Sequence, residues 1–252
     1  MNEVRKEQGR DAVAARIEDC QRLVGSDINF AFQTIIDASE QEVVGFEALV
    51  RGIDGEPAAT VISRISHDQR FDFDQACRIR AIEAAARFGV EGMLHLNCSD
   101  VKLNNIGEVI DVCLHMASLH AIRPDQIVLE LGNLNMVAQN SHLAEIRKAI
   151  RNAGFHVLAD NFGRRNSDLK PIAYLEPSLL KLDYHLVHGI HRSRQAQAIV
   201  RGTLALCADR GIEVMAAGVE SAEEFRWLHN AGIKLFQGYY FAQPGMDETG
   251  NG

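Results

Sequence analysis

The chain has 252 residues, of which 46% are hydrophobic and 24% are charged, and its formal net charge is −8. This length allows one large α/β domain or two small ones, with a full core. The negative charge argues against a general nucleic-acid surface or an anionic-membrane surface, because both need a basic excess. The polar N-terminus is unlike a signal peptide, no apolar run reaches the length of a membrane span, and five scattered cysteines without a Cys-x-x-Cys pair are typical of a reducing cytosol. We therefore expect a cytoplasmic protein with no nucleic-acid or membrane partner.

Residues 1–27 are predicted to form an N-terminal helical segment. Val13, Ile17, Cys20 and Val24 lie on one face of this helix, and we expect that face to pack across the bottom of the following domain.

Short apolar runs then alternate with amphipathic helical patterns. The strands are expected at residues 28–36, 43–50, 93–97, 127–131, 156–160, 178–182, 212–216 and 234–237. Only residues 37–42 separate the first two strands, which is too short for a crossover helix, so these strands should pair antiparallel. The other connections are long enough for helices and right-handed parallel crossovers.

Three helices carry clear signals. One has Leu143, Ile146 and Ile150 on one face and stops at Gly154; another passes through Ile199, Thr203 and Leu206; the last begins with the capping-box pair Ser221 and Glu224. Eight strands in a chain of this length fit an α/β fold of the (β/α)8 TIM-barrel type, with an antiparallel first strand, better than an open doubly wound sheet. We assign the barrel to residues 28–245 and a flexible tail to residues 246–252.

Polar side chains stand at or near the ends of these strands, where a barrel gathers them around one pocket. They are Glu47, Asn97, Glu130, Asp160, Asp183, Glu220 and Gln237. Carboxylate and amide oxygens suit Mg²⁺ or Mn²⁺, whereas zinc favours His or Cys. Lys181 is placed to pair with these acids or to hold a metal-bound water, and Arg51 is placed to bind a phosphate oxygen. A single acid at a strand end is more often a helix cap or a solvated charge, but seven such positions favour a site.

These residues resemble the EAL domain family, the bacterial phosphodiesterases of cyclic di-GMP. The resemblance runs from about residue 28 to residue 244 and includes the motif Glu47-Ala48-Leu49, after which the family is named. The run from Arg51 to Gly55, followed by residues 73–78, is similar to the subgroup fused to blue-light flavin sensors. The family barrel has an antiparallel first strand, in agreement with the expected hairpin.

The resemblance implies a role for each matching position. Glu47, Asn97, Glu130 and Asp160 match the ligands of a first metal ion. Lys181 and Asp183 match the Lys-x-Asp motif, Glu220 the last acid of the Ala-Glu-Gly-Val-Glu motif, Gln237 a pocket glutamine, and Arg51 the arginine that contacts a phosphate of the dinucleotide. Lys181 and Glu220 would belong to the catalytic set, while Arg51, Asp183 and Gln237 would bind the ligand.

Three acids of the family pattern are replaced in this chain. Asn161 stands for an aspartate that binds a second metal, Asn133 for an acid that anchors the following loop, and Ala217 for the glutamate assigned as general base. A general base contributes about 10²–10⁴-fold in rate. We therefore predict an impaired enzyme with Mg²⁺ or Mn²⁺ as its metal and one ion or none bound. It would act as a cyclic di-GMP receptor or as a regulator of an unidentified protein partner, and a homodimer is compatible with the family.

Two alternatives remain open at this stage. The chain could be a slow phosphodiesterase that opens cyclic di-GMP to pGpG, since five acids remain at family positions. It could also be another metal-dependent barrel hydrolase with a different substrate, because a fold alone does not determine a function.

Overall fold

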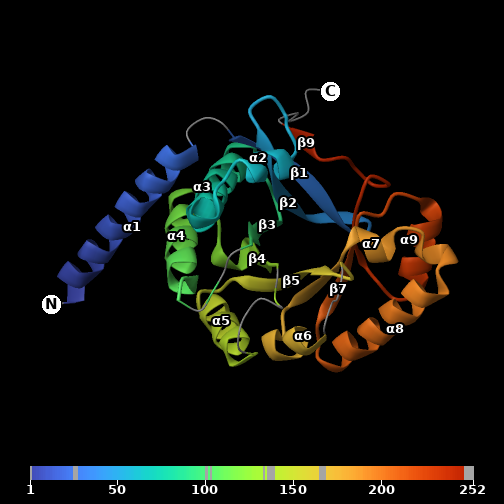
Figure 1. The fold of residues 1–252 in the computed structure, drawn as a ribbon. Helices are drawn as coiled ribbons and strands as arrows, with labels where there is room; N and C mark the ends of the chain where they lie inside the picture. The colour runs from blue at the N-terminus through green and yellow to red at the C-terminus, as the bar shows by residue number, and fades with distance from the viewer. Residues whose placement is uncertain are drawn as a thin grey trace.

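The computed structural model of the chain describes residues 2–24, 28–99, 102, 104–132, 134, 140–164 and 169–246. Its centre is a barrel of strands surrounded by helices (Figure 1). The barrel strands are β1 (Ile28–Asp37), β2 (Glu42–Gly52), β3 (Met93–Cys98), β4 (Ile127–Leu131), β5 (His156–Phe162), β6 (Leu179–Leu182), β7 (Glu213–Ala217) and β8 (Leu235–Gln237). All eight predicted strands are present, and each boundary lies within two residues of its prediction.

The sheet closes through the first strand. The order is β2-β3-β4-β5-β6-β7-β8-β1, and β1 also pairs with β2. Both pairings of β1 are antiparallel, with Gln33 opposite Glu47, whereas β2 through β8 pair in parallel. The TIM-type barrel with an antiparallel first strand is therefore confirmed. A two-residue strand, β9 (Gly245–Met246), adds to β1 beside Ala31 and Phe32; so short a strand has no sequence pattern to reveal it.

The helices lie outside the barrel (Figure 1). They are α1 (Asn2–Val24), α2 (Ala58–Ser63), α3 (Arg70–Arg87), α4 (Ile106–Leu119), α5 (Asn140–Asn152), α6 (Leu169–Leu175), α7 (Tyr184–Val187), α8 (Arg194–Asp209) and α9 (Ala222–Asn230). Short 3-10 turns occur at η1 (His67–Gln69), η2 (Pro124–Gln126) and η4 (Ile190–Arg192).

The three helices predicted from local signals are present. Leu143, Ile146 and Ile150 are buried, and α9 begins with the predicted Ser221–Glu224 capping box. The third predicted helix is α8, which contains Ile199, Thr203 and Leu206. Its buried side chains are Val200, Thr203 and Cys207, whereas Ile199 is 43% exposed.

The N-terminal helix does not cover the bottom of the barrel as predicted. Instead α1 packs against the outer helices α3 and α4, with Ile17 and Cys20 buried. Arg16 forms ion pairs with Asp72 of α3 and Glu108 of α4. The first half of α1 extends beyond the barrel (Figure 1). An apolar face shows that a helix is docked, but it does not specify the surface that receives it.

In the part of the chain that the structure describes, no helix has both the length and the apolar character to cross a membrane.

Candidate active site

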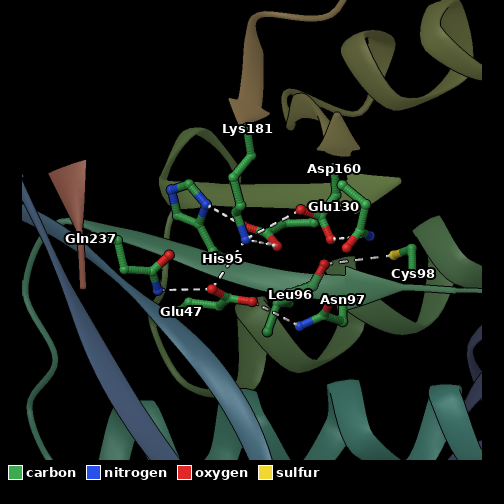
Figure 2. Close-up of polar contacts among 10 residues, drawn as sticks. Glu47, His95, Leu96, Asn97, Cys98, Glu130, Asp160, Lys181 and Gln237 are labelled. Carbon is green, nitrogen blue, oxygen red and sulfur yellow. Dashed lines mark hydrogen bonds and ion pairs between the residues drawn. The ribbon is translucent and has the colours of Figure 1, made fainter. Parts of the chain in front are cut away.

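Six polar side chains from six strands converge inside one end of the barrel (Figure 2). They are Glu47 on β2, Asn97 on β3, Glu130 on β4, Asp160 on β5, Lys181 on β6 and Gln237 on β8. Their positions are consecutive around the sheet apart from β7. The parallel strands present their carboxyl ends at one edge, so side chains distant in sequence become neighbours.

Lys181 lies at the centre of the three acids. Its Nζ atom is 2.5 Å from Glu130 Oε2, 3.0 Å from Glu47 Oε2 and 3.6 Å from Asp160 Oδ1. The lysine is buried, and so is Glu130, which is 1% exposed. A buried ammonium needs compensating carboxylates, and buried carboxylates need a cation, so each depends on the other.

Amide groups fix the orientation of Glu47. Gln237 Nε2 donates to Glu47 Oε2 at 2.8 Å, and Asn97 Nδ2 donates to Glu47 Oε1 at 3.3 Å. The backbone of Gly238 makes this possible, because any Cβ atom there would lie 2.1 Å from the Val219 carbonyl oxygen. Residue 238 must therefore be glycine for Gln237 to reach its place.

The three acids of this cluster differ in the direction of their pKa shifts. Burial acts to raise the pKa of Glu47, but the Lys181 ammonium and the Gln237 amide outweigh it and lower that pKa to about 2. Burial, and then the charge of Glu47, raise the pKa of Glu130 well above its ordinary value. Burial also raises the pKa of Asp160, against the opposing effect of Lys181. One ammonium is thus too little positive charge for three ionised acids, and a further cation would relieve their repulsion.

A cavity of about 340 Å³ opens beside this cluster. Its lining includes the predicted residues Glu47, Asp160, Lys181, Asp183, Glu220 and Gln237, and also Ala217. The buried Glu130 and the exposed Asn97 are both outside this lining. The structure therefore brings eight of the nine predicted residues into this cavity or the cluster beside it.

The β7 side of the cavity is weakly connected to the acid cluster. Asp183 caps α7 by accepting from the His185 backbone at 2.9 Å, and its Oδ1 lies 2.6 Å from His185 Nδ1. The Glu220 side chain is 42% exposed, and its Oε2 atom lies 3.9 Å from His188 Nδ1. Ala217 contributes only a methyl group to the lining. Asp183, Glu220 and Ala217 therefore line the cavity without belonging to the cluster of Lys181 and its acids.

Asn161 lies at an uncommon backbone position beside Asp160. Its φ angle is +62°, in the left-handed region that asparagine and aspartate tolerate better than most residues other than glycine. Its Nδ2 atom donates to Asp160 Oδ2 at 2.7 Å. The side chain therefore holds Asp160 by a hydrogen bond and brings no negative charge of its own.

Arg51 is the predicted residue that the structure places elsewhere. It is half-buried and donates from Nη1 to the Val50 carbonyl oxygen at 2.9 Å, outside the lining of the cavity. Asn133 lies outside the described residues, so its predicted effect on the following loop is a matter of sequence alone.

Two neighbours of the site were not predicted as functional. His95 is buried, and its Nδ1 atom lies 2.8 Å from Glu130 Oε1. Its place two residues before Asn97 put it in the barrel interior, but not beside an acid. Tyr184 lines the cavity over Gly218, where an added Cβ atom would meet the tyrosine ring at 2.9 Å. Its only sequence signal was its position directly after Asp183.

The donor types of this cluster are those that bind a hard divalent cation. Glu47, Glu130 and Asp160 offer carboxylates and Asn97 offers an amide oxygen, the ligands preferred by Mg²⁺ or Mn²⁺. As placed, with the Lys181 ammonium between them, no three acidic, His or Cys residues among those described are already spaced to hold a metal. Binding would require the ammonium to give way. A second ion would lack charge at Asn161.

Comparison with known proteins agrees with this architecture. The sequence model of the EAL domain matches residues 14–244. The chain superposes on a standalone EAL protein from Vibrio cholerae O395, in its c-di-GMP-bound form, with a TM-score of 0.82 and 36% identity, covering 87% of this chain and 93% of that one. The manganese/cy-diGMP complex of BlrP1 from Klebsiella pneumoniae gives a TM-score of 0.79 at 30% identity, covering 87% of this chain and 56% of BlrP1.

A curated relative is longer than this chain. The blue light- and temperature-regulated antirepressor BluF of Escherichia coli K12 is 26% identical over 238 residues, which are 94% of this chain and 59% of BluF. The match therefore spans little more than half of that relative.

Proposed function

Because this chain belongs to the EAL domain family, we propose that it binds cyclic di-GMP and hydrolyses it poorly or not at all. In this role it is a nucleotide receptor or a regulator of a protein partner. The observation that carries the proposal is the contrast between a connected acid–lysine cluster and the alanine at position 217.

Ligand binding is supported by the retained side of the site. Similar proteins from Vibrio cholerae and Klebsiella pneumoniae were crystallised with this dinucleotide. The lining of the cavity beside Lys181 includes amide and carboxylate groups and also Tyr184 and Tyr239. Aromatic rings at the edge of a polar cavity suit a ligand that combines bases with charged phosphates.

The chain is acidic, so a dianionic ligand needs local positive charge. Lys181 supplies one charge, and a divalent ion held by Glu47, Asn97, Glu130 and Asp160 would supply more. When bound, that ion would polarise a phosphoryl oxygen and hold it in the cavity. The residues of the chain then act as follows: Gln237 and Asn97 orient Glu47, while Lys181 balances the acids.

Weak hydrolysis is supported by what the opposite wall lacks. No proton acceptor stands at position 217, and a positioned base contributes about 10²–10⁴-fold in rate. Glu220 is three residues further along the chain, and its side chain is 42% exposed. Two-ion cleavage of a phosphodiester uses one cation on the nucleophile and another on the leaving oxygen. With an amide in place of a carboxylate at position 161, the site for a second cation lacks one negative charge.

A slow phosphodiesterase that yields pGpG is the second candidate. The observation in its favour is the survival of five acids at family positions, Glu47, Glu130, Asp160, Asp183 and Glu220. In that case the site tolerates its losses and retains a measurable turnover.

Equilibrium titration with cyclic di-GMP, with and without Mg²⁺, tests the proposal. We expect saturable binding, strengthened by the metal and abolished in Glu47→Ala. As a control, Glu223→Ala removes an exposed acid on α9 and should bind as the wild type does. Absence of binding under both conditions would reject the receptor function and leave a role in protein interaction.

A further inference from the structure

A continuous series of hydrogen bonds connects the N-terminal helix to the candidate site. It starts at Arg16 on α1, passes through α4 and α3, and ends at Asn97 on β3. We propose that this relay couples the docking of α1 to the position of Asn97, so that α1 regulates the site. The coupling to the backbone of β3 stands on its own contacts, and only its effect on ligand affinity rests on the proposed function.

The site end of the relay is a buried arginine. Arg78 is 2% exposed, and its Nη1 atom donates to the Asn97 carbonyl oxygen at 3.1 Å and to Cys98 Sγ at 3.7 Å. One turn earlier, Asp74 Oδ2 accepts from the Ser99 backbone at 2.9 Å. Two residues of α3 thus hold the last residues of β3. Because Asn97 also donates to Glu47, a shift of this strand end would reach the acid cluster.

The middle of the relay is Gln75. Its Oε1 atom accepts from Arg78 at 2.5 Å and 3.1 Å, and its Nε2 atom donates to Glu108 Oε1 at 3.5 Å. Both Gln75 and Arg78 are buried. A buried guanidinium is costly unless its donors are satisfied, so the orientation of Gln75 determines where Arg78 can lie. The 3.5 Å bond is the longest of the series, and it joins α3 to α4.

The outer end of the relay is the clamp on α1. Arg16 Nε donates to the same Glu108 oxygen at 2.6 Å, and Arg16 also pairs with Asp72, at the start of α3. Glu108 therefore receives both the α1 arginine and Gln75 on one atom. If α1 leaves, Glu108 loses its cation and becomes free to turn toward solvent, and Gln75 loses its outer partner.

The same helix provides a matched control. Arg22 is also on α1, but among the described residues its ion pairs are with Glu18 and Asp19 of that helix, and its side chain is 72% exposed. It thus has the same charge and the same element as Arg16 without a contact to the relay. If substitution of Arg16 changes β3 and substitution of Arg22 does not, the effect depends on the contacts of Arg16 with Glu108 and Asp72.

Hydrogen exchange of the whole, ligand-free chain tests the coupling. We expect Arg16→Ala and Glu108→Gln to speed exchange in peptides covering residues 93–99 by about fivefold or more, the lower limit of typical coupling. Gln75→Leu should do the same while leaving exchange in α1 unchanged. Arg22→Ala should match the wild type, and β7 and β8 peptides serve as the reference for global stability.

Titration with cyclic di-GMP and Mg²⁺ is the second arm. Arg16→Ala should weaken binding by about fivefold or more, and Arg22→Ala should not. Unchanged exchange at residues 93–99 in both Arg16→Ala and Gln75→Leu would overturn the relay. If exchange changes as expected but the wild type binds no dinucleotide, the relay stands and the proposed function fails.

Discussion

The two walls of the cavity are built in different ways. On one wall, from β2 to β6, Lys181 bridges three acids and Glu47 is held by two amides. Glu47, Glu130, Lys181 and Gln237 are buried there. On the other wall, beside β7, Ala217 has no polar group, Asp183 caps a helix, and Glu220 extends into solvent. A barrel can thus keep the part of a site that binds and balances charge while losing the part that moves a proton. The two walls should therefore respond differently to substitution.

Restoring acids on the wall beside β7 should have the largest effect, an increase in the rate of hydrolysis. Ala217→Glu together with Asn161→Asp replaces a base and a negative charge, so hydrolysis of cyclic di-GMP should rise about 10²–10⁴-fold over the wild type. Product separation after incubation with Mn²⁺ measures the change. Ala198→Glu, which adds an acid to the outer face of α8, is the control. If the double variant hydrolysed no faster than the wild type, the cluster of Lys181 and its acids would not support hydrolysis either.

Removing the Lys181 ammonium from the wall that holds the three acids should lower the free energy of unfolding more than any other change considered. Lys181→Met leaves the buried Glu47 and Glu130 and the partly buried Asp160 without their ammonium, and breaking a buried pair typically costs about 3–5 kcal/mol. Urea unfolding gives the free energy, and Mg²⁺ or Mn²⁺ should restore part of it by replacing the lost charge. Lys234→Met, at an exposed position before β8, should change stability little. A wild-type free energy in Lys181→Met would show that the acids do not depend on this lysine.

Glu224 on α9 should make a smaller contribution to stability, and this contribution should depend on pH. Burial acts to raise the pKa of Glu224, but backbone N–H groups of Gly189, Glu220 and Ser221, with the Ser221 hydroxyl, outweigh it and lower that pKa. An acid with a lowered folded pKa stabilises the protein above its unfolded pKa, about 4.5, and this contribution is lost as the pH falls further.

Glu224→Gln should therefore cost about 1–2 kcal/mol at pH 7 and have a flatter loss of stability below pH 4.5. Thermal or urea unfolding across this range measures both values. Glu223→Gln, on the exposed side of the same helix, should keep the wild-type profile. Parallel pH profiles for Glu224→Gln and the wild type would refute the capping role.

Sequence patterns predicted the parts of this molecule that depend on local order. Strand ends, the hairpin of β1 and β2, and the capping box of α9 follow from spacing within a few residues, and the barrel then brings Glu47, Asn97, Glu130, Asp160, Lys181 and Gln237 together. Contacts between distant elements were not predictable in this way. The docking surface of α1, the bond between His95 and Glu130, and the backbone bond of Arg51 depend on packing that no short pattern encodes.

The most direct test of the central claim is a hydrolysis assay of the wild-type chain with cyclic di-GMP. It would be run with Mg²⁺ and with Mn²⁺ at high protein concentration, and pGpG would be detected by product separation. We expect no more product than in Glu47→Ala, from a protein that still binds the dinucleotide. Clear pGpG formation that Glu47→Ala abolishes would contradict this account and make the chain a working phosphodiesterase.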